Sequence, residues 1–320
     1  MRLVCLPAIL LSLSLSGQTR LAYDPFVKGA SADVEIAVSD EEGVAVGGAE
    51  VTVWFEVSSV KSEKRTGTTA ADGIFAASLD TCTGGVIVNV KKDGYYGTSV
   101  REFIRRQTED AVVRTRKWSP GPVRLTVTLR KIRNPAKLVR NWGLDRLAYP
   151  ATNVVMGFDL ERRDWCPPYG KGKYEDWQVC YRFSRSPSEW GTFHEHVVIT
   201  MTNGLDGVCF CPVESFSDFK YAYHADTNAT YAKRVEVELD RTYAKILKRV
   251  CLPEGRFIVF RTRTRVDNNG RLVSAHYGYV PEPFHTRLFF DISTMFNPNE
   301  NDTNLESIPD SRNRTKKGRR

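Results

Sequence analysis

The chain has 320 residues, of which 41% are hydrophobic and 26% are charged, a balance typical of a globular protein long enough for two domains. Its formal net charge is +8, but the last ten residues, SRNRTKKGRR, carry six positive charges and no negative ones. The basic character therefore belongs mainly to a solvated tail, which argues against a nucleic-acid-binding domain.

The first predicted element is an export signal, MRLVCLPAILLSLSLSGQTRLA, at residues 1–22. Arg2 precedes an apolar run from Leu3 to Leu15, and small or polar residues follow it. This order is typical of a secretory signal peptide that is cleaved during export to the periplasm, the cell surface or the medium. An uncleaved anchor is the alternative, although the run is shorter than the ~20 residues that span a bilayer, and no later segment is long and apolar enough to do so.

A first β domain is expected directly after the signal. Polar and apolar residues alternate in DVEIAV (33–38), EVTVWFEV (50–57), IFAASL (74–79), GGVIVNVKKDGYYG (84–97) and PVRLTVTLRKI (122–132). Period-two runs separated by Gly-rich turns predict an antiparallel β-sandwich. Asp72-Gly73 matches a tight hairpin turn with positive φ, after which Phe75 points into the core. Residues 100–118 interrupt the pattern and are predicted to form a solvated basic loop, with a short amphipathic helix as the alternative.

Three motifs give this domain a specific resemblance. They are VSDEEGVAVGGAEVTV (38–53), TAADGIF (69–75) and VNVKKDGYY (88–96), in that order. Residues 31–132 resemble the carboxypeptidase regulatory-like, or transthyretin-like, domain. The resemblance implies an Ig-like or prealbumin-like sandwich and a non-catalytic role in stability, spacing or binding.

A second β-rich domain is predicted over residues 136–298. Pro135 marks the joint, and strand-like runs then recur as far as Phe296. A helix is expected around residues 243–250, and Arg261, Arg263 and Arg265 are expected to alternate onto a solvent-exposed strand face, with an anion or acidic-glycan site as the alternative. Residues 301–320 are predicted to be a disordered basic tail.

The phrases GFDLERRDWCPPYGKGK and RTRTRVDNNGRLVSAHYGYV, in this second domain, resemble a group of exported bacterial proteins of unassigned function. This second resemblance implies an exported two-domain architecture, but no activity, cofactor or ligand.

Six cysteines follow the predicted signal. An oxidising compartment favours disulfides, for which the candidates are Cys166, Cys180, Cys209, Cys211 and Cys251. The connectivity stays open, and the close spacing of Cys209 and Cys211 suggests different partners for the two.

His194 and His196 are the candidate metal ligands. Because they stand at i and i+2, a strand would place both imidazoles on one face. A metal would need a further ligand, such as His224, Asp226, His276 or His285, and a pair of surface histidines without a metal is the alternative. No cofactor is predicted.

No motif assigns a catalytic residue. The chain lacks a G-x-S-x-G elbow and a Gly-rich phosphate loop. The carboxylate pairs Asp159 with Glu161 and Glu175 with Asp176 could support glycoside hydrolysis only at the required separation.

Aromatic residues favour ligand binding over catalysis. The candidates for stacking on a glycan, with core packing as the alternative, are Trp165, Tyr169, Trp190, Tyr221 and Tyr223. The sequence therefore predicts an exported, non-enzymatic cell-envelope or secreted protein with a structural sandwich and a β domain that binds a glycan or another envelope component. The alternative is a glycan-processing or metal-dependent hydrolase whose site lies in residues 136–298.

Overall fold

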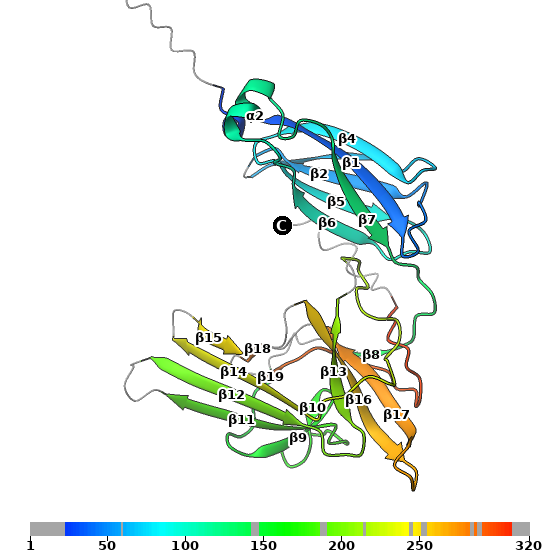
Figure 1. Cartoon of the computed structure of the whole chain (residues 1–320). Helices are drawn as coiled ribbons and strands as arrows, with labels where there is room; N and C mark the ends of the chain where they lie inside the picture. The colour runs from blue at the N-terminus through cyan, green and yellow to red at the C-terminus, as the bar shows by residue number, and fades with distance from the viewer. Residues whose placement is uncertain are drawn as a thin grey trace, which may run out of the picture.

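The computed structural model describes residues 23–58, 60–141, 147–185, 191–213, 216–242, 246–250, 255–281, 285–286 and 290–308. Over these ranges the protein is mainly β, which confirms the predicted fold class, and its strands gather in two bodies (Figure 1). The predicted signal peptide, Trp190 and Cys251 lie outside the described residues. The two described helices have four and seven residues, so neither reaches the ~20 residues of a membrane-spanning helix.

The first body contains a three-stranded sheet of order β4-β1-β7 and a four-stranded sheet of order β3-β2-β5-β6. The strands are β1 (Ala30–Asp40), β2 (Glu50–Glu56), β3 (Ser62–Thr68), β4 (Ile74–Thr81), β5 (Gly85–Lys91), β6 (Thr98–Phe103) and β7 (Val123–Leu129). Helix α1 (Pro25–Lys28) precedes β1, and helix α2 (Glu109–Thr115) lies between β6 and β7. Residues 100–118 thus supply the end of a strand and a short helix, so the expected solvated loop is wrong and the helical alternative holds.

The sequence alternation determines which residues of this body face inward. Buried residues alternate with half-buried ones along all of β1. Val34 and Ile36 of β1 join Val53 and Phe55 of β2 in one apolar core between the two sheets. Gly73 turns the chain into β4 with a φ of 78°, and a Cβ at this position would collide with a backbone carbonyl oxygen.

The second body contains a six-stranded sheet of order β10-β9-β11-β12-β14-β15, a five-stranded sheet of order β13-β16-β17-β20-β8, and the pair β18-β19. The six-stranded sheet comprises β9 (Val155–Asp159), β10 (Asp164–Trp165), β11 (Trp177–Arg185), β12 (Thr192–Thr200), β14 (Arg234–Thr242) and β15 (Ile246–Val250). The other strands are β8 (Val139–Asn141), β13 (Gly207–Pro212), β16 (Arg256–Val266), β17 (Leu272–Val280), β18 (His285–Thr286), β19 (Phe290–Asp291) and β20 (Thr294–Phe296).

The five-stranded sheet is covered on both faces. Ile258 and Phe260 of β16 pack in a core shared with the six-stranded sheet. Phe257 and Val259 of the same strand point the other way, into a second core that includes the aromatic segment 219–223. A strand buried on both faces requires consecutive apolar residues, as in RFIVF at the start of β16.

Two boundaries differ from the sequence prediction. Residues 246–250, expected to be helical, form strand β15, which pairs with β14. Residues 301–308, expected to belong to a disordered tail, are described and include the fully buried Leu305 and the buried Glu306. The predicted domain end at residue 298 is therefore too early, because the next residues complete a core and the contact with the first body.

A group of buried and half-buried polar side chains joins the two bodies, and we call it the joint: Glu41, Tyr96, Arg130, Tyr223 and Glu306. Arg130, directly after β7, is only 1% exposed; it donates to the carbonyl oxygen of Tyr221 at 2.5 Å and pairs with Glu41 at 3.1 Å. Its guanidinium also lies 4.3 Å from the ring centroid of Tyr223.

Glu306 holds the opposite side of the joint. It accepts hydrogen bonds from the backbone nitrogens of Arg133 and Asn134 at 2.8 and 2.7 Å, and from the hydroxyl of Tyr96 at 2.9 Å. Burial and this carboxylate both raise the pKa of Tyr96 far above its usual value, so the hydroxyl keeps its proton and remains a donor.

Candidate functional site

Most of the predicted glycan-stacking residues lie in cores. Trp165 is 2% exposed and donates its indole N–H to the carbonyl oxygen of Ala148. Tyr221 and Tyr223 are 8% and 9% exposed and pack against the five-stranded sheet and the joint. Burial takes these three rings away from any surface ligand: Trp165 packs in the core shared by the two large sheets, and segment 219–223 covers the second face of the five-stranded sheet. Of the described candidates, Tyr169 alone is exposed, at 38%.

The described cysteines are free thiols. Cys166, Cys180, Cys209 and Cys211 form no disulfide, nor does Cys82, and this contradicts the predicted bonds among the described candidates. Cys209 and Cys211 share a face of β13 with their sulfurs 3.9 Å apart, but two residues along a strand span about 7 Å between α-carbons, beyond the usual reach of a disulfide.

Cys166 is enclosed near several carboxylates. Its thiol donates to the carbonyl oxygen of Tyr174 at 3.3 Å. Burial, followed by the negative charge of Asp159, raises the pKa of this thiol to about 11. Cys166 is therefore a protonated structural residue at neutral pH rather than a nucleophile.

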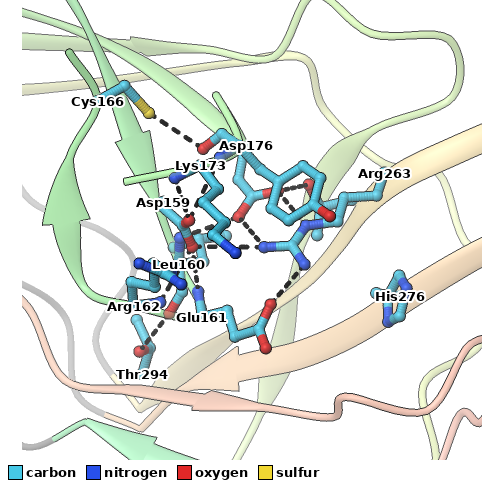
Figure 2. A network of polar contacts seen from close by, with 12 residues as sticks. Asp159, Leu160, Glu161, Arg162, Cys166, Lys173, Asp176, Arg263, His276 and Thr294 are labelled. Carbon is cyan, nitrogen blue, oxygen red and sulfur yellow. Dashed lines mark hydrogen bonds and ion pairs between the residues drawn. The ribbon is translucent and has the colours of Figure 1, made fainter. Parts of the chain in front are cut away.

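Two clusters of charged side chains occupy the second body, and the first is built around Arg263 (Figure 2). The pairing of β16 with β17 shifts register between Thr262 and Arg265, and Arg263 has a φ of 54°. Asp206 stabilises this bulge by accepting hydrogen bonds from the backbone nitrogens of Arg263 and Thr264 at 3.1 and 2.8 Å. The bulge turns the guanidinium of Arg263 inward, since its side chain is only 14% exposed.

Three carboxylates converge on this guanidinium, and together with it they form what we call the Arg263 centre. Asp176 binds it through two oxygens at 3.0 and 3.1 Å, Glu161 at 2.6 Å and Asp159 at 3.4 Å. The ring centroid of Tyr174 lies 3.8 Å from the guanidinium carbon. The cation is thus held by charge, by paired hydrogen bonds and by an aromatic face.

The same carboxylates fold the loop that follows β9. Asp159 accepts from the backbone nitrogens of Glu161, Arg162, Lys173 and Tyr174, and Asp176 accepts from Leu160. The centre therefore binds residues 159–176 to strand β16. Asp159 and Asp176 are buried, which leaves Glu161 as the member with exposed carboxylate surface and makes the buried pair unsuitable for contact with a glycoside substrate.

Charge is unbalanced within the Arg263 centre, because three carboxylates share one guanidinium. Burial raises the pKa of Asp176 above its usual value, and the hydrogen bonds and charge of Arg263 offset this only in part. Burial acts to lower the pKa of Arg263, but Asp176 and Glu161 outweigh it, and the net shift is upward. Several carboxylates stabilise the charged form of the one guanidinium, whereas the single cation that stabilises ionised Asp176 is shared with the other carboxylates. The predicted solvent-exposed face of Arg261 and Arg263 is wrong, since both lie largely inside.

The second cluster lies on the outer face of the six-stranded sheet. His194 and His196 share this face of β12, opposite Asp240 and Glu238 of β14 in the strand register. His194 Nδ1 lies 2.8 Å from a carboxylate oxygen of Asp240, and His196 Nε2 lies 3.1 Å from one of Glu236. Hydrogen bonds from Arg234 and then His196 lower the pKa of Glu236, so it is ionised at neutral pH.

His196, Glu236 and Glu238 each offer one ligand atom, and these atoms lie within 4.8 Å of one another. Three of the further-ligand candidates from the sequence have other contacts: His224 contacts Thr303, His276 stacks on Phe296, and Asp226 accepts a hydrogen bond from the backbone nitrogen of Asn228. The side chain of His285 is outside the described part of the structure. The two glutamates were not predicted as metal ligands from the sequence, because β14 pairs with β12 although β13 lies between them in the chain. The alternation of Glu236, Val237 and Glu238 in KRVEVELD did indicate that both glutamates share one face of a strand.

No family model and no curated protein matches the chain. Among solved structures, catechol 1,2-dioxygenase from Acinetobacter radioresistens matches with 17% identity and a TM-score of 0.26, over 34% of this chain and 55% of that one. The major pilin subunit BcpA of Bacillus cereus matches with 10% identity and a TM-score of 0.25, over 78% of this chain and 64% of the pilin. The chain thus spans about half of the dioxygenase, and such low TM-scores carry no conclusion about fold or function.

Proposed function

We propose that this chain is an exported, non-enzymatic protein of the cell envelope or the secreted fraction, in which the first sandwich is a spacing module fixed rigidly to a ligand-presenting second β domain. The observation that carries the proposal is the joint. Arg130 and Glu306 are both 1% exposed, and each binds groups from the other body. A flexible linker would leave such groups in water, whereas a buried charged contact holds two domains in one orientation.

The joint combines these polar contacts with apolar packing, since the ring of Tyr96 in the first body lies 5.1 Å from that of Phe219 in the second. Burying the charge of Arg130 is costly unless partners replace water, and Glu41, Tyr221 and two aromatic rings do so. Because these partners require precise geometry, the contact favours one relative orientation of the sandwiches. This property suits a spacer that presents a surface at a fixed distance.

The proposed ligand is a glycan of the envelope, with the exposed loop that carries Tyr169 and Tyr174 as its contact surface. Tyr174 is 50% exposed, and Arg263 supports one side of its ring at 3.8 Å. A ring held flat against a guanidinium loses little freedom when a sugar stacks on its other side. Neither a nucleic acid nor a membrane-spanning partner is part of this proposal.

Calorimetric unfolding of the full chain tests the rigid-spacer proposal. The unaltered protein is expected to unfold in one cooperative transition, and Glu306→Ala, which removes the acceptor for three donors, is expected to split it into two. Glu300→Ala is the matched control, since this exposed carboxylate pairs with the exposed Arg265 and lies away from the joint. Two independent transitions in the unaltered protein would contradict the proposal. Fractionation of the producing cells tests export separately.

A further inference from the structure

The outer face of β12 and β14 gathers metal-ligating groups on rigid backbone. Residues directly opposite in antiparallel strands point to the same face, so His196 and Glu238 stand side by side. Glu236 is two positions along β14 and therefore shares this face. Both strands are interior members of the six-stranded sheet, and Val197, Val237 and Leu239 on the opposite face are buried in the core or against it.

A cation on the same face helps to position one of these groups. Arg234 donates to Glu236 Oε1 at 2.6 Å, while Oε2 of the same carboxylate faces His196 Nε2 at 3.1 Å. Because Arg234 holds one carboxylate oxygen of Glu236 in place, the other oxygen stays directed toward His196, where a metal ion would be bound. Arg182 lies opposite His196 on β11 and adds positive charge, but Glu236, Glu238 and Asp240 together supply three carboxylates.

We propose that His196, Glu236 and Glu238 bind one divalent transition-metal ion, with Zn²⁺ as the best-fitting ion. One imidazole nitrogen and two carboxylate oxygens are accepted zinc ligands, and the imidazole disfavours Mg²⁺ and Ca²⁺, which prefer oxygen alone. Bonds of ~2.1 Å to a tetrahedral ion place ligand atoms ~3.4 Å apart. The three ligand atoms now lie within 4.8 Å of one another, so rotation of the glutamate side chains is enough to close the site. Glu236 is exposed and Glu238 half-buried, which leaves room for this rotation.

Three protein ligands leave one position of a tetrahedral ion open. That position takes a water molecule or a donor atom from a second molecule. The site is separate from the joint and from the Tyr169 surface, and it does not depend on the proposed spacer role.

Zinc titration of the full chain, purified without a histidine tag, tests the site by calorimetry and native mass spectrometry. One Zn²⁺ per chain is expected, with Mg²⁺ and Ca²⁺ failing to compete at the same concentration. His196→Ala and the isosteric Glu238→Gln are each expected to weaken binding at least about tenfold. His194→Ala is the matched control, because it removes the neighbouring imidazole on the same face but none of the three ligands.

A further control addresses the thiols. The double variant Cys209→Ser, Cys211→Ser is expected to retain the zinc affinity, because these residues lie on β13 in the other large sheet. Circular dichroism confirms that each variant is folded. The proposal is overturned if the unaltered chain binds no zinc, if His196→Ala and Glu238→Gln bind as tightly as the unaltered chain, or if His194→Ala or the cysteine variant abolishes binding.

Discussion

The Arg263 centre and the outer face of β12 and β14 both bring basic side chains and carboxylates together, but at very different exposure. Inside, Asp159 and Asp176 are saturated by backbone donors and one guanidinium. Outside, the carboxylates of Glu236 and Asp240 remain partly in water. A buried charge must have its partners built into the fold, whereas an exposed one can exchange water for a ligand. The first cluster is therefore structural, and the second is available for binding.

The largest expected effect is the loss of the central cation. Arg263→Met leaves Asp159 and Asp176 buried without it, and we expect a loss of about 3–5 kcal/mol in the free energy of unfolding. Arg265→Met, two residues along the same strand, is the control; Arg265 is 69% exposed and pairs with Glu300, so its loss should cost about 1 kcal/mol or less. Urea unfolding measures both, and equal costs would refute the contrast between the clusters.

The bulge that directs Arg263 inward gives the next largest effect. Asp206→Ala removes the acceptor for two backbone N–H groups, of which only that of Thr264 is buried, and a buried donor left unpaired costs about 1–3 kcal/mol. Asp267→Ala is matched to it, because Asp267 also accepts two backbone N–H groups, those of Asn269 and Arg271, but in an exposed turn. Water can replace the lost acceptor there, so Asp267→Ala should cost less in the same urea experiment. If the exposed turn proves the more sensitive, the bulge does not position the centre.

This bulge also shows where sequence reasoning stops. The alternation of Arg261, Arg263 and Arg265 predicts one exposed face, and a single inserted residue with positive φ cancels that prediction. A glycine in the sequence would have indicated a residue with positive φ, whereas an arginine gives no such indication. The sequence likewise left Trp165 open between stacking on a glycan and packing in the core, because its pairing with Phe158 of β9 is not visible in a local pattern.

Local patterns were better guides. The two-residue period of DVEIAV and EVTVWFEV corresponds to β1 and β2, and the i, i+2 spacing of the histidines places both on one face of β12. The period at residues 246–250 fits a strand as well as a helix, and pairing with β14 decided it. The glutamates beside His196 come from a strand pairing that skips β13, which no local pattern reveals.

One carboxylate from each cluster, Asp176 and Glu236, should contribute to the free energy of unfolding with opposite dependence on pH. The pKa of Asp176 is raised by burial, so its stabilising contribution is complete below its ordinary pKa of 3.8 and is lost as pH rises through the folded value. The pKa of Glu236 is lowered by its hydrogen bonds, so its contribution is complete above 4.5 and is lost as pH falls through the folded value.

Asp176→Asn and Glu236→Gln remove these titrations one at a time. Between about pH 3 and about pH 7, the stability advantage of the unaltered chain over Asp176→Asn should shrink as pH rises, and its advantage over Glu236→Gln should grow. Urea unfolding at successive pH values gives both difference curves. Slopes of the same sign would mean that the two carboxylates do not occupy the contrasting environments described.

The smallest effect is expected at the His194–Asp240 pair. Although its atoms are 2.8 Å apart, the side chains are 48% and 30% exposed, and ordering two exposed groups offsets most of their attraction. A double-mutant cycle with His194→Ala and Asp240→Asn should give a coupling of about 0.2–1 kcal/mol, reduced further by salt. A coupling of about 3–5 kcal/mol, the size of the loss expected for Arg263→Met, would show that the outer face is a structural cluster too. A small one means that His194 can be removed without disturbing the sheet, and this is what makes it a sound control for the zinc ligands beside it.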